Sequence, residues 1–163
     1  MKCSETADRI IGICERNQHG ALVLDLGGLV LARRFGLRRF KTAAERAAFM
    51  ADRAQELAVD YNVNRIAVER QGELVGYLRV LRLQPEELSL AEVKKRVLSV
   101  DVPKRNQNLI ETVAEIRPNL RRFALAGRDR PVFTTGEPDR WRTVVLMAGA
   151  FALAAKRQTT SSN

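Results

Sequence analysis

The segment Ile66-Ala67-Val68-Glu69 joins three apolar residues of an expected buried strand to an acidic residue at the strand's end. A carboxylate at the end of a central strand is costly to remove from water unless a cation or hydrogen-bond donors compensate it. Two interpretations of Glu69 follow. It either pairs with a basic group, such as Arg65, Arg70 or a basic helix, or it belongs to a functional site.

Three short apolar strands and a helix are expected before this segment. The strands cover, in chain order, residues 10–13, 21–26 and 29–33. The first two are joined by a hairpin turn at Asn17-Gln18-His19-Gly20, and Gly27-Gly28 turns the chain into the third. Thr42 with Glu45 forms a capping-box pattern, which predicts the start of a helix there. The expected order is therefore strand, strand, strand, helix, strand.

The remainder of the chain is expected to be mainly helical. Ser89 with Glu92 forms a second capping box and opens a short basic helix. Residues 124–137 are rich in glycine and proline and indicate a mobile loop. Pro138-Asp139 starts a last helix, whose stretch from 144 to 155 has no polar side and should be buried nearly all round.

The length of 163 residues and the 45% apolar content indicate one domain, residues 1–157, followed by a disordered polar tail, 158–163. Cys3 and Cys14 are too few for a disulfide framework and lack zinc-ligand spacing. The first residues do not resemble a signal peptide, and the longest apolar run is shorter than the ~20 residues that span a bilayer. We expect a cytoplasmic protein without membrane contact, nucleoid-associated if bacterial.

Basic residues outnumber acidic ones by 28 to 19, which gives a formal net charge of +9. Such an excess favours a polyanionic partner, most often nucleic acid. A single cation is usually a solvated surface residue, but clustering raises the odds of a binding role. Trp141 is placed to stack on an exposed base or to cover a helix start. The predicted nucleic-acid contacts are Arg38, Arg39, Lys94, Lys95, Lys104, Arg105 and Arg140.

The order of the elements and four motifs resemble the RuvC-type crossover-junction (Holliday-junction) endonucleases, a branch of the ribonuclease-H-like superfamily. The motifs are Ile11-Gly12-Ile13 with Gly20 and Val23-Leu24, then Ile66-Ala67-Val68-Glu69, then Glu92-Val93-Lys94 with Pro103-Lys104, and Asp139 before the apolar helix. The resemblance implies an α/β, ribonuclease-H-like fold: a mixed five-stranded sheet, its first three strands antiparallel, with helices on both faces. It also implies a homodimer whose two basic grooves take two arms of a junction.

In that family four carboxylates hold two magnesium ions, which activate water and stabilise the leaving oxygen of a phosphodiester. Glu69 and Asp139 match two of these positions. Cys14 stands where the family has a metal-binding aspartate on the first strand, and Arg142 stands where the last helix has its second aspartate. A thiolate is a poor ligand for Mg²⁺, and Arg142 would add positive charge where a cation should sit.

These departures favour a degenerate nuclease that binds branched or structured nucleic acid with weak or no cleavage. One alternative is an active Mg²⁺-dependent junction-resolving endonuclease that uses Glu69, Asp139 and either Glu15 or Asp25. Another is a protein-interaction subunit that binds an acidic partner through the basic face. Asp139 is also explained by a helix cap, and Cys14 by a small buried hydrophobe.

Overall fold

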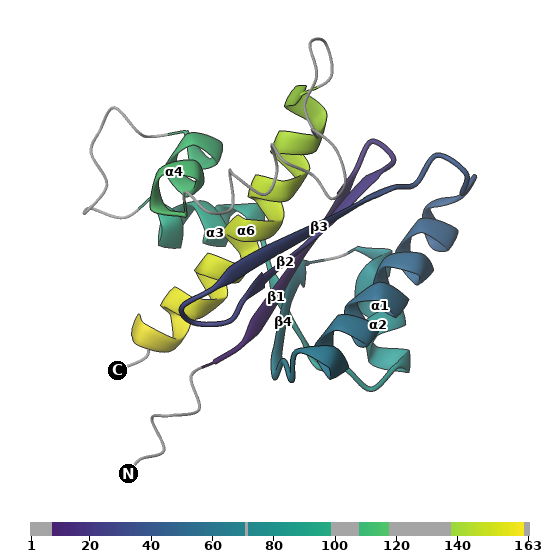
Figure 1. The fold of residues 1–163 in the computed structure, drawn as a ribbon, viewed down its shortest axis with the longest axis horizontal. Coiled ribbons are helices and arrows are strands. Elements are labelled where there is room, and N and C mark those ends of the chain that lie inside the picture. The colour runs from purple at the N-terminus through teal and green to yellow at the C-terminus, as the bar shows by residue number, and fades with distance from the viewer. Residues whose placement is uncertain (1–7, 71, 99–107, 118–137, 162–163) are drawn as a thin grey trace.

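The computed structural model describes residues 8–70, 72–98, 108–117 and 138–161, and within the last range it describes the side chains of residues 142–157. A five-stranded mixed sheet lies in the middle (Figure 1). Its strands are β1 (Ile10–Arg16), β2 (His19–Asp25), β3 (Val30–Gly36), β4 (Arg65–Glu69) and β5 (Pro85–Leu88). The first three pair antiparallel, β4 pairs parallel to β1 and β5 parallel to β4, in the order β3-β2-β1-β4-β5. The predicted mixed sheet is therefore confirmed.

The turn between β1 and β2 is shorter than the sequence suggested. Asn17 and Gln18 both have a left-handed backbone, with φ of 52° and 65°. Positive φ at both central residues is the signature of a two-residue type I′ turn, whose twist matches that of the strands it joins. His19 is consequently the first residue of β2 and not part of the turn.

Helices cover both faces of the sheet (Figure 1). One face carries α1 (Ala43–Asp60) and α2 (Glu73–Val80), and the other carries α6 (Pro138–Ser161), against which α3 (Leu90–Val97) and α4 (Leu109–Ile116) pack. Because successive side chains of a strand point to opposite faces, β1 divides its residues between two cores. Ile11 and Ile13 pack towards α1, whereas Ile10 and Cys14 pack towards α6.

Both capping boxes predicted from the sequence are present. The Thr42 hydroxyl accepts from the backbone N–H of Glu45, whose carboxylate accepts from the backbone N–H of Thr42, and α1 begins there. Ser89 and Glu92 do the same for α3. Backbone hydrogen bonds from these caps hold the pKa values of both glutamates below their usual range. Local capping therefore fixes where the two helices start.

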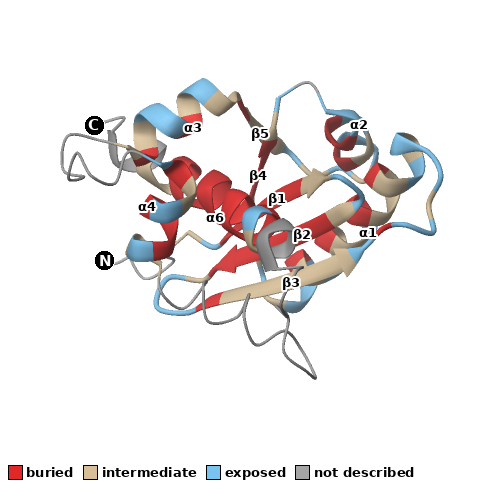
Figure 2. Cartoon of the chain, turned by 90° about the horizontal axis from the view of Figure 1, so that it is seen from above, coloured by how far each residue is buried: buried red, intermediate tan, exposed pale blue. Residues whose placement is uncertain are grey.

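Helix α6 is buried nearly all round, as its lack of a polar side predicted (Figure 2). It crosses β1 at Gly12, where a Cβ atom would lie only 2.0 Å from the carbonyl oxygen of Ala148. The helix continues to Ser161, four residues beyond the predicted end of the domain at residue 157. Extending a formed helix costs little, which accounts for the extra turn. None of the described helices is both long and apolar enough to cross a bilayer.

Candidate functional site

The carboxyl-terminal ends of β1 and β4 form the site that the sequence pointed to. The two strands are parallel neighbours, and Gly12 lies opposite Ala67 in their register. Two residues further along each strand come Cys14 and Glu69. Since strand side chains alternate with a period of two, these residues share the face that carries α6. The fold therefore brings positions 14 and 69 to one edge of the sheet, as expected.

Glu69 is paired with a cation that the sequence analysis did not identify. Nη2 of Arg16 lies 3.4 Å from Oε1 of Glu69, and the two side chains are 38% and 45% exposed. The partners suggested from the sequence are engaged elsewhere, Arg65 with Asp8 and Glu86, and Arg70 with Glu92. A signal for Arg16 was present, because it follows Cys14 by two residues and so lies on the same face of β1.

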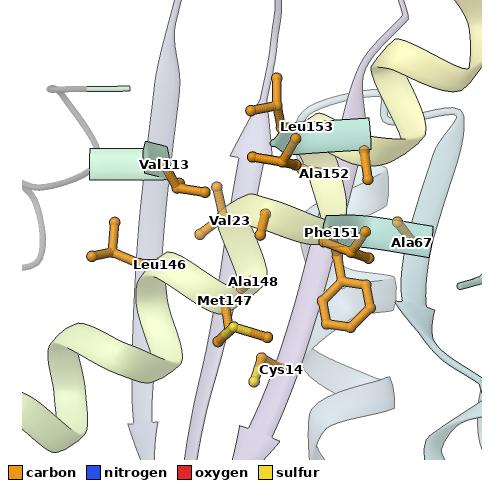
Figure 3. Packing of buried hydrophobic residues seen from close by; sticks show 14 of the residues in the cluster. Cys14, Val23, Ala67, Val113, Leu146, Met147, Ala148, Phe151, Ala152 and Leu153 are labelled. Atoms are coloured by element: carbon orange, nitrogen blue, oxygen red, sulfur yellow. The ribbon is translucent and has the colours of Figure 1, made fainter. Parts of the chain in front are cut away.

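Cys14 is a neutral thiol in the folded protein. Its side chain is buried between β1 and α6, beside Met147 (Figure 3). Burial raises the pKa of the thiol to about 12, against the lowering effect of the nearby Arg16 guanidinium. At neutral pH the position therefore offers neither negative charge nor a hard oxygen ligand, both of which Mg²⁺ requires.

The two residues proposed to replace Cys14 lie in different places: Glu15 lines the same pocket as Cys14 and Glu69, whereas Asp25 does not. Glu15 pairs with Arg46 of α1, with its Oε2 3.4 Å from Nε of that arginine. Asp25 lies at the opposite edge of the sheet, because it pairs with Ile10, whereas Cys14 pairs with Ala21. Those four residues of β2 separate the two positions by roughly 13 Å at the usual rise per strand residue. The alternative with Asp25 as a metal ligand is therefore wrong.

Helix α6 begins at the same end of the molecule as Glu69. Its far end lies at the opposite edge, where the carbonyl oxygen of Ala155 accepts from Arg65 and where Lys156 pairs with Asp25. Arg142 pairs with Glu111 on α4, with its Nη2 3.1 Å from Oε2 of that glutamate. The side chains of Asp139, Arg140 and Trp141 lie outside those that the structure describes, so their predicted roles stay predictions.

A pocket of about 220 Å³ opens at this edge, between the strand ends and the starts of α1 and α2. Three carboxylates contribute to its lining together with Cys14 and apolar side chains. Two of them, Glu15 and Glu69, already have arginine partners. The third, Glu73, lies in the first turn of α2 and makes no described ion pair. Most of the negative charge that lines the pocket is therefore neutralised by ion pairs with arginines.

The described side chains do not fit a magnesium centre. They contain no group of three or more histidine, cysteine, aspartate or glutamate side chains placed to share one ion. The first-strand position is a protonated thiol, and the strand acid Glu69 is compensated by Arg16. Mg²⁺ demands several oxygen ligands in near-octahedral geometry, which this donor set does not supply.

Exposed cations lie on both sides of the sheet. Lys94 and Lys95 are exposed on α3, make no described ion pair, and follow Glu92, which the Arg70 pair ties to the end of β4. Arg38 and Arg39 are exposed in the connection from β3 to α1. The predicted contacts Lys104 and Arg105, and the loop 124–137, lie outside the described residues.

The Arg39 guanidinium rests on aromatic side chains, with its central carbon 4.5 Å from the ring centroid of Phe40 and 5.0 Å from that of Phe49. Arg39 is therefore held at the surface by stacking and not by a carboxylate. Its full charge stays available to a polyanion.

No protein-family model matches the sequence, and no curated protein matches it either. Solved structures of RuvC from Thermus thermophilus share its fold. One aligns with a TM-score of 0.56 at 16% identity, over 94% of this chain and 96% of the other. A second, in complex with a Holliday junction substrate, aligns with a TM-score of 0.59 at 14% identity over the same shares. At such identities the likeness shows the fold alone, and this fold is RuvC-like.

Proposed function

We propose that the protein binds branched or structured nucleic acid on a RuvC-like fold without metal-dependent cleavage. The observation that supports the absence of metal-dependent cleavage is the ion pair between Arg16 and Glu69. A guanidinium fixed beside the strand acid supplies the positive charge that a metal ion would supply in a nuclease. Cys14 is a neutral thiol, and two of the three carboxylates that line the pocket, Glu15 and Glu69, are already paired with arginines, whereas two metals would need several free oxygen ligands.

Nucleic-acid binding is supported by the charge and its distribution. The chain carries a formal net charge of +9. Lys94 and Lys95 are exposed on α3, and neither makes a described ion pair. The RuvC structure from Thermus thermophilus with a junction substrate adds a neighbour of the same fold that binds branched DNA. DNA and RNA are both compatible with a phosphate-directed surface.

The test is a gel-shift series with four-way, forked, duplex and single-stranded substrates at 50 and 200 mM salt, with and without Mg²⁺ or Mn²⁺. We expect salt-sensitive shifts, strongest for branched substrates, and no metal-dependent product. Binding through several phosphates should weaken by about 10³-fold or more between the two salt concentrations. Metal-dependent cleavage by the unmodified chain would contradict the non-catalytic assignment, and the absence of any shift would contradict nucleic-acid binding.

A matched pair of variants locates the surface. The double variant Lys94→Gln/Lys95→Gln removes two positive charges from α3, and Arg82→Glu makes the same total charge change at the opposite edge of the sheet, where Arg82 is exposed. We expect only the first to reduce the salt dependence of binding, by about 2 in the slope of log K against log salt. Equal effects of both variants would indicate a response to net charge alone.

We also propose a homodimer, in line with the resemblance to RuvC-type enzymes. Measurement of the molar mass in solution by light scattering tests it, since the single chain has a mass of 18.3 kDa. A monomeric mass at the concentration used for gel shifts would contradict the dimer. Nucleic-acid binding by one groove would be unaffected by that result.

A further inference from the structure

We infer that the guanidinium of Arg16 is itself a phosphate-binding group, which contacts the backbone of the bound nucleic acid at the carboxyl-terminal ends of β1 and β4. The inference rests on the proposed function and adds to it a residue that the sequence pattern did not mark. The ligand class is a phosphodiester oxygen pair, which matches the planar fork of arginine.

The hydrogen-bonding capacity of Arg16 is only partly used. A guanidinium has five N–H donors. Its described contacts are one Nη2 contact of 3.4 Å to Glu69 and a hydrogen bond to the Cys14 thiol. The ion-pair distance is long for a charge-assisted bond, which is usually about 2.7–2.9 Å. The Nε atom is buried and has no described acceptor, whereas 38% of the side chain as a whole is exposed, so a ligand would reach the outer nitrogens of the guanidinium.

The positive charge of Arg16 is only partly cancelled. Cys14 stays protonated and so does not neutralise it. The carboxylate of Glu15, the residue before Arg16 on β1, forms an ion pair with Arg46 instead. Among the carboxylates that the structure describes, Glu69 is the one that pairs with Arg16, and it is 45% exposed and so partly screened by water. An entering phosphate can share the guanidinium with Glu69 or displace it.

The path to Arg16 is bordered by further cations. Arg70 follows Glu69 directly and joins it to α3 through Glu92, at a distance of 3.0 Å. Lys94 and Lys95 lie beyond Glu92 on the exposed side of that helix. Arg96, the next residue of that helix, donates to the carbonyl oxygen of Ala154 near the far end of α6. The two lysines therefore extend the basic surface along α3 away from Arg16, and Arg70 is the described cation at the same strand end.

Binding measurements on three variants test the inference. Arg16→Gln should weaken binding by about ten-fold and reduce the salt slope by about 0.9, the effect of one lost phosphate contact. Arg82→Gln removes the same charge at the opposite edge of the sheet and should have little effect. Glu69→Gln should strengthen binding, because it releases Arg16 and removes a charge that repels phosphate.

The outcomes separate this inference from the proposed function. If Lys94→Gln/Lys95→Gln weakens binding and Arg16→Gln does not, Arg16 is a structural partner of Glu69 and the inference is wrong, while the proposed function stands. If the unmodified chain binds no nucleic acid, both fail together. Thermal melts report whether Arg16→Gln is folded. Should it be unfolded, Arg16→Lys keeps the charge without the fork, and an unchanged affinity there would reject the bidentate contact.

Discussion

Three alternate residues on the α6 face of β1 show how side-chain size changes along one strand. Gly12 has no side chain because α6 crosses it directly, with the carbonyl of Ala148 in the space of a Cβ atom. Cys14 is small enough to remain buried under the helix. Arg16, at the end of the strand, reaches past the covered region to Glu69. Packing against α6 thus explains why a small side chain stands at position 14.

The buried thiol of Cys14 predicts a pH dependence of stability. Its pKa is about 12 in the folded chain against an ordinary value of 9.0. Between these values the folded state keeps the proton and the unfolded state loses it, so the free energy of unfolding falls as the pH rises above 9. From pH 8.5 to pH 10 we expect Cys14 to account for a fall of about 1 kcal/mol.

Urea unfolding of Cys3→Ala and of Cys3→Ala/Cys14→Ala at both pH values measures this fall. The methyl side chain that Cys14→Ala introduces changes the packing by the same amount at each pH. The contribution of the thiol is therefore the difference between the two proteins in how far the free energy of unfolding falls from pH 8.5 to pH 10. If both proteins lose equal stability, Cys14 is not held protonated by burial, and the case against a charged ligand at this position weakens.

At the residue scale the sequence predicted which positions lie together, but not which side chains form ion pairs with their charged residues. Cys14 and Glu69 were expected together from the resemblance to RuvC-type enzymes, and the structure supplies the reason, because parallel neighbouring strands and a period of two give them one edge and one face. The partners of Glu69 and Arg65 depended on which long side chains reach each other after folding, and sequence spacing does not carry that information. Arg65 joins Asp8, Glu86 and the carbonyl of Ala155, which come from three separate parts of the chain.

At the element scale, the contact between α6 and Gly12 of β1 sets how closely the helix packs against the sheet. The contact is a backbone contact, since the amide nitrogen of Ala152 would lie 2.8 Å from a Cβ atom at position 12. Neither the helix nor the strand can yield there without moving as a whole. The substitution of one hydrogen atom by a methyl group should therefore displace α6.

We expect Gly12→Ala to lower the free energy of unfolding by about 3 kcal/mol or more, as overpacking of a rigid contact does. The comparison is Gly76→Ala in α2, where nothing lies within 4 Å of the added methyl group. That change should stabilise the protein by about 0.5–1 kcal/mol, because alanine is the better helix former. Chemical denaturation measures both. Similar effects of the two substitutions would show that α6 does not sit on Gly12.

Elements with local signals were predicted well, and elements defined by tertiary contacts were not. Both capping boxes lie within four residues of sequence and mark helix starts correctly. The end of α6 was placed at residue 157, but the helix runs to Ser161. No local stop signal marks that point, and packing of the preceding turns supports the extension. The predicted length of the turn between β1 and β2 was too great, because Asn17 and Gln18, both with a left-handed backbone, close the hairpin without His19.

At the scale of the whole molecule, a buried charge cluster opposite the candidate site joins three distant segments. Asp25 ends β2 with only 4% of its side chain exposed. It pairs with Arg117 at the end of α4, at 3.1 Å, and with Lys156 of α6, at 3.5 Å. Its Oδ1 also accepts from the backbone N–H of Gly27 in the next turn. One carboxylate therefore fixes the ends of two helices against the sheet.

Asp25→Asn should be among the most damaging single changes in the described chain. It removes the charge but keeps the shape, and so leaves Arg117 and Lys156, whose side chains are 25% and 38% exposed, beside a neutral amide. Loss of one partner from a fully buried ion pair typically costs about 3–5 kcal/mol, and the exposure of both cations lowers this cost, so we expect a loss of about 2–3 kcal/mol in urea unfolding. Asp52→Asn, on the exposed side of α1, makes the same chemical change and should cost less than about 0.5 kcal/mol.

Because the cluster lies at the edge away from Glu69, nucleic-acid binding by the folded fraction of Asp25→Asn should match that of the unmodified chain. A stable Asp25→Asn protein that fails to bind would instead mean that Asp25 acts in the site.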